Sequence, residues 1–116
     1  MREPDIAWKN IGPVDGIPVQ GARRLCFGYQ GLPLAVFRTS DGQVFALADT
    51  CPHKSGPLSE GIVSGGTVTC PLHNWTIDLA TGQAVAPDEG MTASLPVRIA
   101  DGNVLVGLPR YAGSAA

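Results

Sequence analysis

Turn-forming residues constrain the fold of this chain more than any other feature of its sequence. The 116 residues include 15 glycines and 10 prolines. One or the other interrupts each run of about ten residues that would otherwise suit a helix. The apolar segments between them are short and rich in β-branched and aromatic residues, as strands are. The sequence therefore predicts an all-β protein built as an antiparallel β-sandwich or barrel.

Two Asp-Gly pairs mark the clearest strand pairs. Asp41-Gly42 separates LPLAVFRTS from QVFALAD, and Asp101-Gly102 separates PVRIA from NVLVGL. An Asp-Gly pair between two strand-forming segments is typical of a hairpin, because both residues accept the backbone angles of a tight turn. Each pair therefore predicts one hairpin. Further strands are expected at 8–11, 19–27, 62–63, 68–69 and 75–79, with a turn at 80–82 and at most one helical turn near 87–90.

Length and charge restrict the domain count and the class of partner. A chain of 116 residues suits one domain, 1–116, folding as a unit from about Ile6 to Val106 with a disordered tail at 111–116. Eight basic against ten acidic residues, spread without a run of one sign, disfavour nucleic acid and anionic membranes as partners. No segment approaches the roughly 20 apolar residues of a membrane span, and the start lacks the apolar centre of a secretory signal. We expect a soluble cytoplasmic protein.

The residues that carry metal chemistry gather in two short segments, CPHKSG and CPLHNW. These segments contain both histidines of the chain, His53 and His73, and two of its three cysteines, Cys51 and Cys70. Sixteen residues separate the Cys51-x-His53 pair from the Cys70-x-x-His73 pair. The residues between the segments read as a hairpin that turns at Gly65-Gly66. Such a hairpin would bring the tips of the two loops together.

Two thiolates and two imidazoles can bind zinc, or a [2Fe-2S] cluster in which two histidines replace two cysteines on one iron. Zinc fingers usually place their cysteines together and their histidines together. Here each loop supplies one of each, which favours the cluster over zinc. The third cysteine, Cys26, lies in RRLCFG and is expected to be a small buried residue on a strand rather than a disulfide partner or reactive group.

The C-x-H and C-x-x-H pair, with GPL after the first loop, resembles the Rieske [2Fe-2S] family. The resemblance implies that Cys51 and Cys70 bind the inner iron, and that His53 and His73 bind the outer iron near solvent. It also implies a β-sandwich that carries an inserted cluster-binding subdomain at about 49–77.

Residues around the two loops have expected supporting roles. Pro57, Leu58 and Leu72 are expected to exclude water from the sulfur atoms and to form an apolar rim for a partner. Gly56, Gly61, Gly65 and Gly66 are expected to permit tight turns with backbone N–H groups that point at sulfur. Trp75 is either an apolar lid beside the cluster or a core aromatic of its strand, and the core interpretation is favoured.

Respiratory Rieske proteins reach high potentials with a disulfide between the loops and with Ser and Tyr hydroxyls bonded to the cluster. Here Leu72 and Gly56 stand where the disulfide cysteines are expected, and Asn74-Trp75 follows His73 without a Ser-x-Tyr sequence. The sequence therefore predicts a potential at the low end of the range of about -150 to +300 mV.

The stretch from Pro52 to Gly90, with CPLHNW and PDEG as its most specific parts, resembles the small subunits of NAD(P)H-dependent assimilatory nitrite reductases. The resemblance implies a subunit that is not catalytic alone. Its partner would be a large subunit that carries flavin, an iron-sulfur centre and siroheme and reduces nitrite to ammonium. The alternative is the ferredoxin component of an aromatic-ring dioxygenase, which shares the ligand spacing and a similar size. A third interpretation, from another class, is a zinc-stabilised non-redox interaction module.

Overall fold

The computed structural model describes residues 6–29, 32–49, 57–70, 75–85 and 90–109. Within these ranges the chain forms strands and two single turns of 3-10 helix, so the prediction of an all-β fold is confirmed. The strands are β1 (Ile6–Pro13), β2 (Gly21–Tyr29), β3 (Leu32–Arg38), β4 (Val44–Ala48), β5 (Ile62–Ser64), β6 (Thr67–Thr69), β7 (Thr76–Asp78), β8 (Ser94–Leu95), β9 (Val97–Ala100) and β10 (Asn103–Pro109). The 3-10 turns are η1 (Val14–Gly16) and η2 (Leu58–Glu60).

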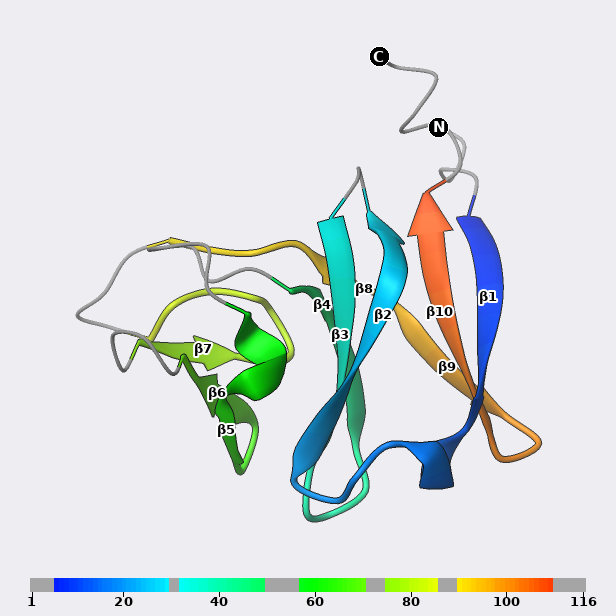
Figure 1. Ribbon diagram of the computed structural model, residues 1–116, viewed down its shortest axis with the longest axis horizontal. Coiled ribbons are helices and arrows are strands. Elements are labelled where there is room, and N and C mark those ends of the chain that lie inside the picture. The colour runs from blue at the N-terminus through cyan, green and yellow to red at the C-terminus, as the bar shows by residue number, and fades with distance from the viewer. Residues whose placement is uncertain (1–5, 30–31, 50–56, 71–74, 86–89, 110–116) are drawn as a thin grey trace.

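These strands form three antiparallel sheets, which Figure 1 shows side by side. The central sheet has the order β2-β3-β4-β8, and the β1-β10-β9 sheet lies on one side of it. The small β5-β6-β7 sheet lies on the other side and contains the second half of the segment predicted to hold the cluster. The central sheet therefore stands between a sandwich partner and the sheet that carries Cys70.

Strands β3 and β4 are buried on both faces, and this explains their continuous apolar sequences, LAVF and FALA. One face contributes Ala35, Phe37 and Leu47 to a loop-side core shared with the small sheet. The loop-side core consists of Ala35, Phe37, Leu47, Leu58, Val63, Val68, Cys70, Ile77 and Leu79. The opposite face contributes to a sandwich core of Ile11, Ile17, Leu25, Leu34, Val36, Ala46, Leu95, Val104 and Val106. The central sheet thus supports the small sheet through the loop-side core.

The predicted hairpins are present. Strands β3 and β4 pair antiparallel across Asp41-Gly42, and strands β9 and β10 pair across Asp101-Gly102. In the first turn the Thr39 hydroxyl donates a hydrogen bond to the Asp41 carboxylate, which holds the pKa of Asp41 below its usual value. The third hairpin turns at Gly65-Gly66 as expected, since Ser64 pairs with Thr67 and Gly65 has a φ of 56°.

The sequence did not predict β8 or the extension of the small sheet beyond β7. Strand β8 pairs with β4 through two residues, Ser94 and Leu95. Beyond β7, Ala84 bridges to Ile77, and the Val85 N–H donates to the Thr76 carbonyl at 2.8 Å. Segments this short show no measurable periodicity, so only the pairing reveals them. The helical turn expected near 87–90 falls largely outside the described residues, as does the tail 111–116.

Candidate metal centre

The base of the second predicted ligand loop is well defined. Thr69 pairs with Thr76 at the end of the β6-β7 ladder, and their hydroxyl oxygens lie 3.3 Å apart. One residue further, the Cys70 N–H donates to the Trp75 carbonyl at 2.7 Å. The chain between Cys70 and Trp75, which contains His73, therefore starts and ends at one point of the hairpin. His73 itself lies outside the described residues.

Cys70 is fully buried and belongs to the loop-side core. Trp75 is partly buried and packs against the same core, so the structure supports the interpretation of Trp75 as a core aromatic. An apolar setting excludes water from a thiolate and from the metal it binds. The environment of Cys70 therefore suits an inner, protected ligand better than a solvent-facing one.

Two expectations about neighbouring residues are wrong. Leu58 has no exposed surface, so it cannot belong to a surface rim that meets a partner, although its place in the loop-side core does exclude water there. The Gly61 N–H donates to the Leu58 carbonyl at 2.9 Å and is therefore not directed at sulfur. Pro57 is half-buried, and Leu72 lies outside the described residues.

The first predicted loop begins just after Asp49, a residue that the sequence analysis did not single out. The Asp49 carboxylate has no exposed surface and lies 3.2 Å from Nε of Arg24, measured to Oδ2. It accepts hydrogen bonds from Ser59, one from the backbone N–H at 2.7 Å and one from the hydroxyl at 2.6 Å. An acidic residue at the end of an apolar strand segment, two positions before a predicted ligand, is a sequence signal that could have identified it.

Three of the four predicted ligands, Cys51, His53 and His73, lie outside the described residues. In the ranges that the structure covers, no group of three or more His, Cys, Asp or Glu side chains is placed to hold a metal ion. The complete ligand set therefore remains a prediction. For Cys26, the structure shows its position on β2, where the pairing with β3 shifts register between Leu25 and Gly28, but does not describe its side chain.

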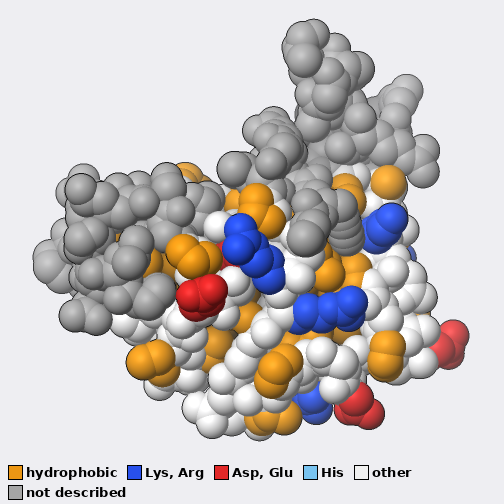
Figure 2. Space-filling view, viewed as in Figure 1, with side chains coloured by type: hydrophobic (Ala, Val, Ile, Leu, Met, Phe, Trp, Pro, Cys, Tyr) orange, Lys and Arg blue, Asp and Glu red, His pale blue; other side chains and the backbone are white. Residues whose placement is uncertain are grey.

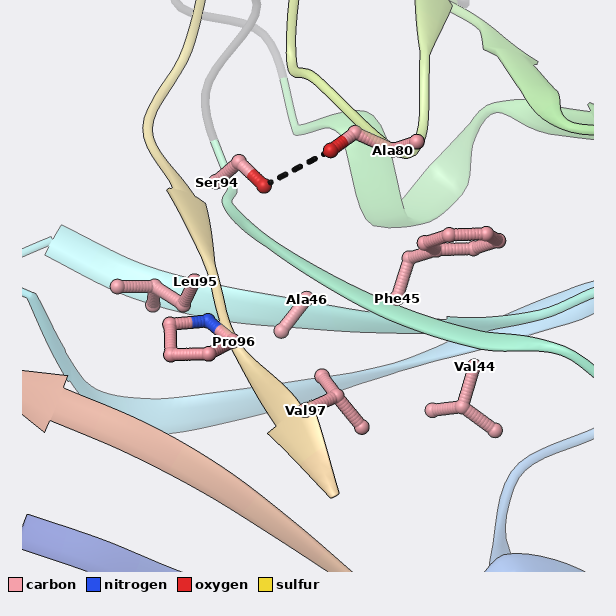
Figure 3. Close-up of a pocket in the computed structure, with 8 residues that line it drawn as sticks. All are labelled: Val44, Phe45, Ala46, Ala80, Ser94, Leu95, Pro96 and Val97. Carbon is pink, nitrogen blue, oxygen red and sulfur yellow. Dashed lines mark hydrogen bonds between the residues drawn. The ribbon is translucent and has the colours of Figure 1, made fainter. Parts of the chain in front are cut away.

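A hollow of about 290 Å³ lies elsewhere on the molecule, between β4 and the β8-β9 segment (Figure 3). The Ser94 hydroxyl donates to the Ala80 carbonyl at 3.3 Å across one side of it. The lining is otherwise apolar or small: Val44, Phe45, Ala46, Leu95, Pro96 and Val97. The described residues that line the hollow include no titratable or metal-binding side chain.

Charges of both signs share the face seen in Figure 2. Basic side chains extend across the middle of this face, and acidic side chains lie close to them rather than in a separate patch. Two ion pairs occur among the described residues: Arg24 with the buried carboxylate of Asp49 at 3.2 Å, and Arg38 with Asp15 at 3.9 Å. Among the described residues, no helix is long and apolar enough to cross a membrane.

Comparisons with known proteins place this arrangement in a family. Residues 7–96 match the model of the Rieske [2Fe-2S] domain. The chain is 39% identical over 108 residues to the ferredoxin subunit of anthranilate 1,2-dioxygenase from Burkholderia cepacia, covering 91% of this chain and 97% of that protein. It is also similar to a chain in the solved complex of reduced oxygenase and oxidised ferredoxin of carbazole 1,9a-dioxygenase. That match has a TM-score of 0.75 and 30% identity, and it covers 85% of this chain and 91% of the other.

A further solved relative is a protein from Mycobacterium tuberculosis assigned as the small subunit of an NADH-dependent nitrite reductase. The TM-score is 0.79 and the identity 21%, over 89% of this chain and 96% of the other. At this identity the likeness shows the fold alone.

The chain therefore belongs to the Rieske [2Fe-2S] domain family. Its cofactor is a Rieske-type [2Fe-2S] cluster, and it is a redox protein that transfers electrons. The residues present fit that cofactor, because Cys70 provides a buried sulfur at the base of a hairpin loop within an apolar core. Cys51, His53 and His73 are predicted to complete the donor set, and two cysteines with two histidines match the family's cluster.

Proposed function

We propose that this chain is the electron-transferring small subunit of an NAD(P)H-dependent nitrite reductase. The observation that carries the proposal is the stretch from Pro52 to Gly90, with CPLHNW and PDEG, which resembles the small subunits of these enzymes. The partner is a large subunit that holds flavin, an iron-sulfur centre and siroheme and reduces nitrite to ammonium. The chain acts in the cytoplasm and is not catalytic alone.

Within this proposal the chain is one Rieske domain, 1–116, whose cluster-binding subdomain covers about 49–77. Cys51 and Cys70 bind one iron, and His53 and His73 bind the other. When bound, the cluster accepts and releases single electrons, and its neutral imidazole ligands make reduction easier than four thiolates would.

The residues of the chain shield one side of the cluster and hold its ligands. The loop-side core, with Leu58 and Val68, keeps water from Cys70. The hydrogen bond between Cys70 and Trp75 keeps the two ends of the second loop together. Ligands held on a closed hairpin reorganise little when the charge of the site changes, which favours fast electron transfer.

A second candidate function is the ferredoxin component of an aromatic-ring dioxygenase. It is favoured by the 39% identity with the anthranilate 1,2-dioxygenase ferredoxin subunit, which extends over nearly the whole of both chains. In this alternative the cluster is the same, and the electron passes to an oxygenase instead of a siroheme subunit. The two candidates differ in the partner and agree on the cofactor.

Identifying the partner subunit decides between the two candidate functions. The rate of nitrite reduction driven by NAD(P)H is measured with the large subunit alone and again after addition of this chain. We expect the addition to raise the rate at least about tenfold, which corresponds to a decrease of about 1.4 kcal/mol in the activation barrier. His53→Ala protein should bind the large subunit without restoring the rate. Equal restoration by His53→Ala would assign the cluster a structural role. Absence of binding to the siroheme subunit, together with electron delivery to a ring-hydroxylating oxygenase, would establish the second candidate.

The reduction potential is expected to lie below about 0 mV at neutral pH, near the low end of the range of histidine-ligated [2Fe-2S] centres. The reason is the absence of the features that raise it in respiratory Rieske proteins. Leu72 and Gly56 cannot form a disulfide, and Trp75 replaces a residue that could donate a hydroxyl hydrogen bond. Protein-film voltammetry measures the midpoint directly. A value above about +150 mV would contradict this interpretation of the residues around the cluster.

A further inference from the structure

Asp49 connects three elements of the fold through one buried carboxylate. It follows β4, and its oxygen atoms contact Arg24 on β2 and Ser59 in η2. Ser59 uses both its backbone N–H and its hydroxyl for this contact, at 2.7 and 2.6 Å. A single side chain thus links the central sheet to the turn that precedes the small sheet.

The main chain around Asp49 is itself held in place. The Asp49 N–H donates to the Pro33 carbonyl at 2.8 Å, and the Ala48 N–H donates to the Ala93 carbonyl at 2.8 Å. The Thr92 hydroxyl adds a hydrogen bond to the Ala48 carbonyl at 3.0 Å. Because its backbone is fixed on the central sheet, the carboxylate provides a firm point to which η2 is attached.

The two predicted ligand loops are therefore held by different means. Backbone pairing of β6 and β7 continues to Cys70 and Trp75 at the base of the second loop. The first loop runs from the end of β4 to the start of η2, and these two elements do not pair as strands. Across this gap the Asp49 carboxylate receives two hydrogen bonds from Ser59, ten positions further along the chain.

We propose that Asp49 is a positioning residue that closes the first ligand loop. By binding Ser59 it holds together residues 49 and 59, which lie on either side of the segment that carries Cys51 and His53. Closure of a loop by a buried, charge-assisted contact removes conformational freedom that metal binding would otherwise have to remove. The inference rests on the ligand set proposed above.

Burial of a carboxylate is unfavourable unless it is paired and hydrogen-bonded. Asp49 satisfies this condition with an ion pair to Arg24 and two hydrogen bonds from Ser59. An apolar residue of similar size could fill such a position without the penalty of burying charge. A role in joining the ends of a ligand loop explains why an acid is present there.

The test compares Asp49→Asn with Asp78→Asn. Asp78 is a suitable control because its carboxylate, like that of Asp49, accepts two hydrogen bonds. The donors to Asp78 are the backbone N–H groups of Ala80 and Thr81, at 2.8 and 3.3 Å. It lies at the end of β7 opposite to the ligand loop, so the same chemical change there leaves the ligands untouched. Both variants are prepared with the cluster bound, and wild-type protein is measured beside them.

The first measurement is the rate of iron release to a ferrous chelator under reducing conditions, at a temperature where circular dichroism shows intact sheets. Asp49→Asn should release iron at least about tenfold faster than wild type, because hydrogen bonds to a charged group are worth a factor of about ten or more. Asp78→Asn should stay within about twofold. Equal rates for the two variants would overturn the proposal.

The second measurement is the midpoint potential, which a contact with a purely structural role would leave unchanged. Asp49→Asn removes a buried negative charge two positions before Cys51, and this favours the reduced, more negative cluster. The potential should therefore rise in Asp49→Asn and remain at the wild-type value in Asp78→Asn. An unchanged potential in Asp49→Asn would also contradict the proposal.

A milder variant keeps the test informative if Asp49→Asn does not fold. Ser59→Ala removes only the hydroxyl donor and leaves the charge pair and the backbone hydrogen bond, so it should accelerate iron release by less than Asp49→Asn would. Release at the wild-type rate from Ser59→Ala would count against the closure. Failure of the ligand set is recognised separately, because Cys51→Ser protein would then retain its cluster.

Discussion

Replacing His73 with alanine is expected to abolish binding of the [2Fe-2S] cluster, whereas replacing Cys26 with serine is expected to leave the cluster in place. The chain has one other histidine, His53, and it is itself a proposed ligand. No spare imidazole can therefore replace that of His73. With one ligand missing, an iron atom of the cluster is left open to water, and the cluster is degraded during assembly. Cys26 lies on β2 and is not part of the proposed ligand set.

The measurement is iron and acid-labile sulfide per chain in anaerobically prepared protein. Wild type and Cys26→Ser should contain about two of each and give the electron paramagnetic resonance signal of a histidine-ligated [2Fe-2S] centre when reduced. His73→Ala should be colourless, with the circular dichroism of an intact sheet protein. A full complement of iron in His73→Ala would refute its assignment as a ligand, and a single zinc in wild-type protein would refute the cluster itself.

Gly82→Ala is expected to cause a large loss of stability, whereas Gly102→Ala causes a small one. Both glycines have a φ of +79°, so alanine meets the same backbone strain of about 1–2 kcal/mol at either position. Their surroundings differ. A Cβ at Gly82 would lie 2.2 Å from the Thr92 carbonyl oxygen, whereas a Cβ at Gly102 would meet nothing within 4 Å.

The clash at Gly82 involves main chain that cannot move aside easily, because the Thr92 N–H donates to the Gly82 carbonyl at 2.8 Å. We therefore expect Gly82→Ala to lower the free energy of unfolding by roughly 2–3 kcal/mol more than Gly102→Ala. Urea denaturation followed by circular dichroism measures both values. Equal losses in the two variants would mean that the segment around Thr92 adjusts freely.

Local sequence patterns predicted much of this fold correctly. Asp41-Gly42, Asp101-Gly102 and Gly65-Gly66 marked three hairpins, and each is present with the expected partners. Such turns depend on backbone angles that few residues adopt, so their signal is contained in two adjacent residues. Strand β8 and the bridge between Ile77 and Ala84 were missed, because two-residue pairings depend on distant partners and not on local preference.

For the candidate site, residue type and spacing were enough to indicate the family and its cofactor. Metal chemistry depends on few side chains, and both histidines of the chain stand beside two of its three cysteines. The same reasoning misjudged Leu58, which was expected on a surface rim and is fully buried. An apolar residue near a predicted ligand can face either the solvent or the core. For Leu58, only the packing of η2 against the central sheet shows that the side chain faces the core.

By itself the sequence determined the all-β class, the hairpins and the identity of the cofactor, because each depends on residues close together in the chain or on the chemistry of a few side chains. Tertiary structure alone decided that β3 and β4 are buried on both faces between two cores. It also decided that Arg24, Asp49 and Ser59, which are separated in sequence, meet beside the segment predicted to form the first ligand loop. The physical reason is that burial and long-range pairing depend on which surfaces pack together. A local sequence pattern does not predict which surfaces those are.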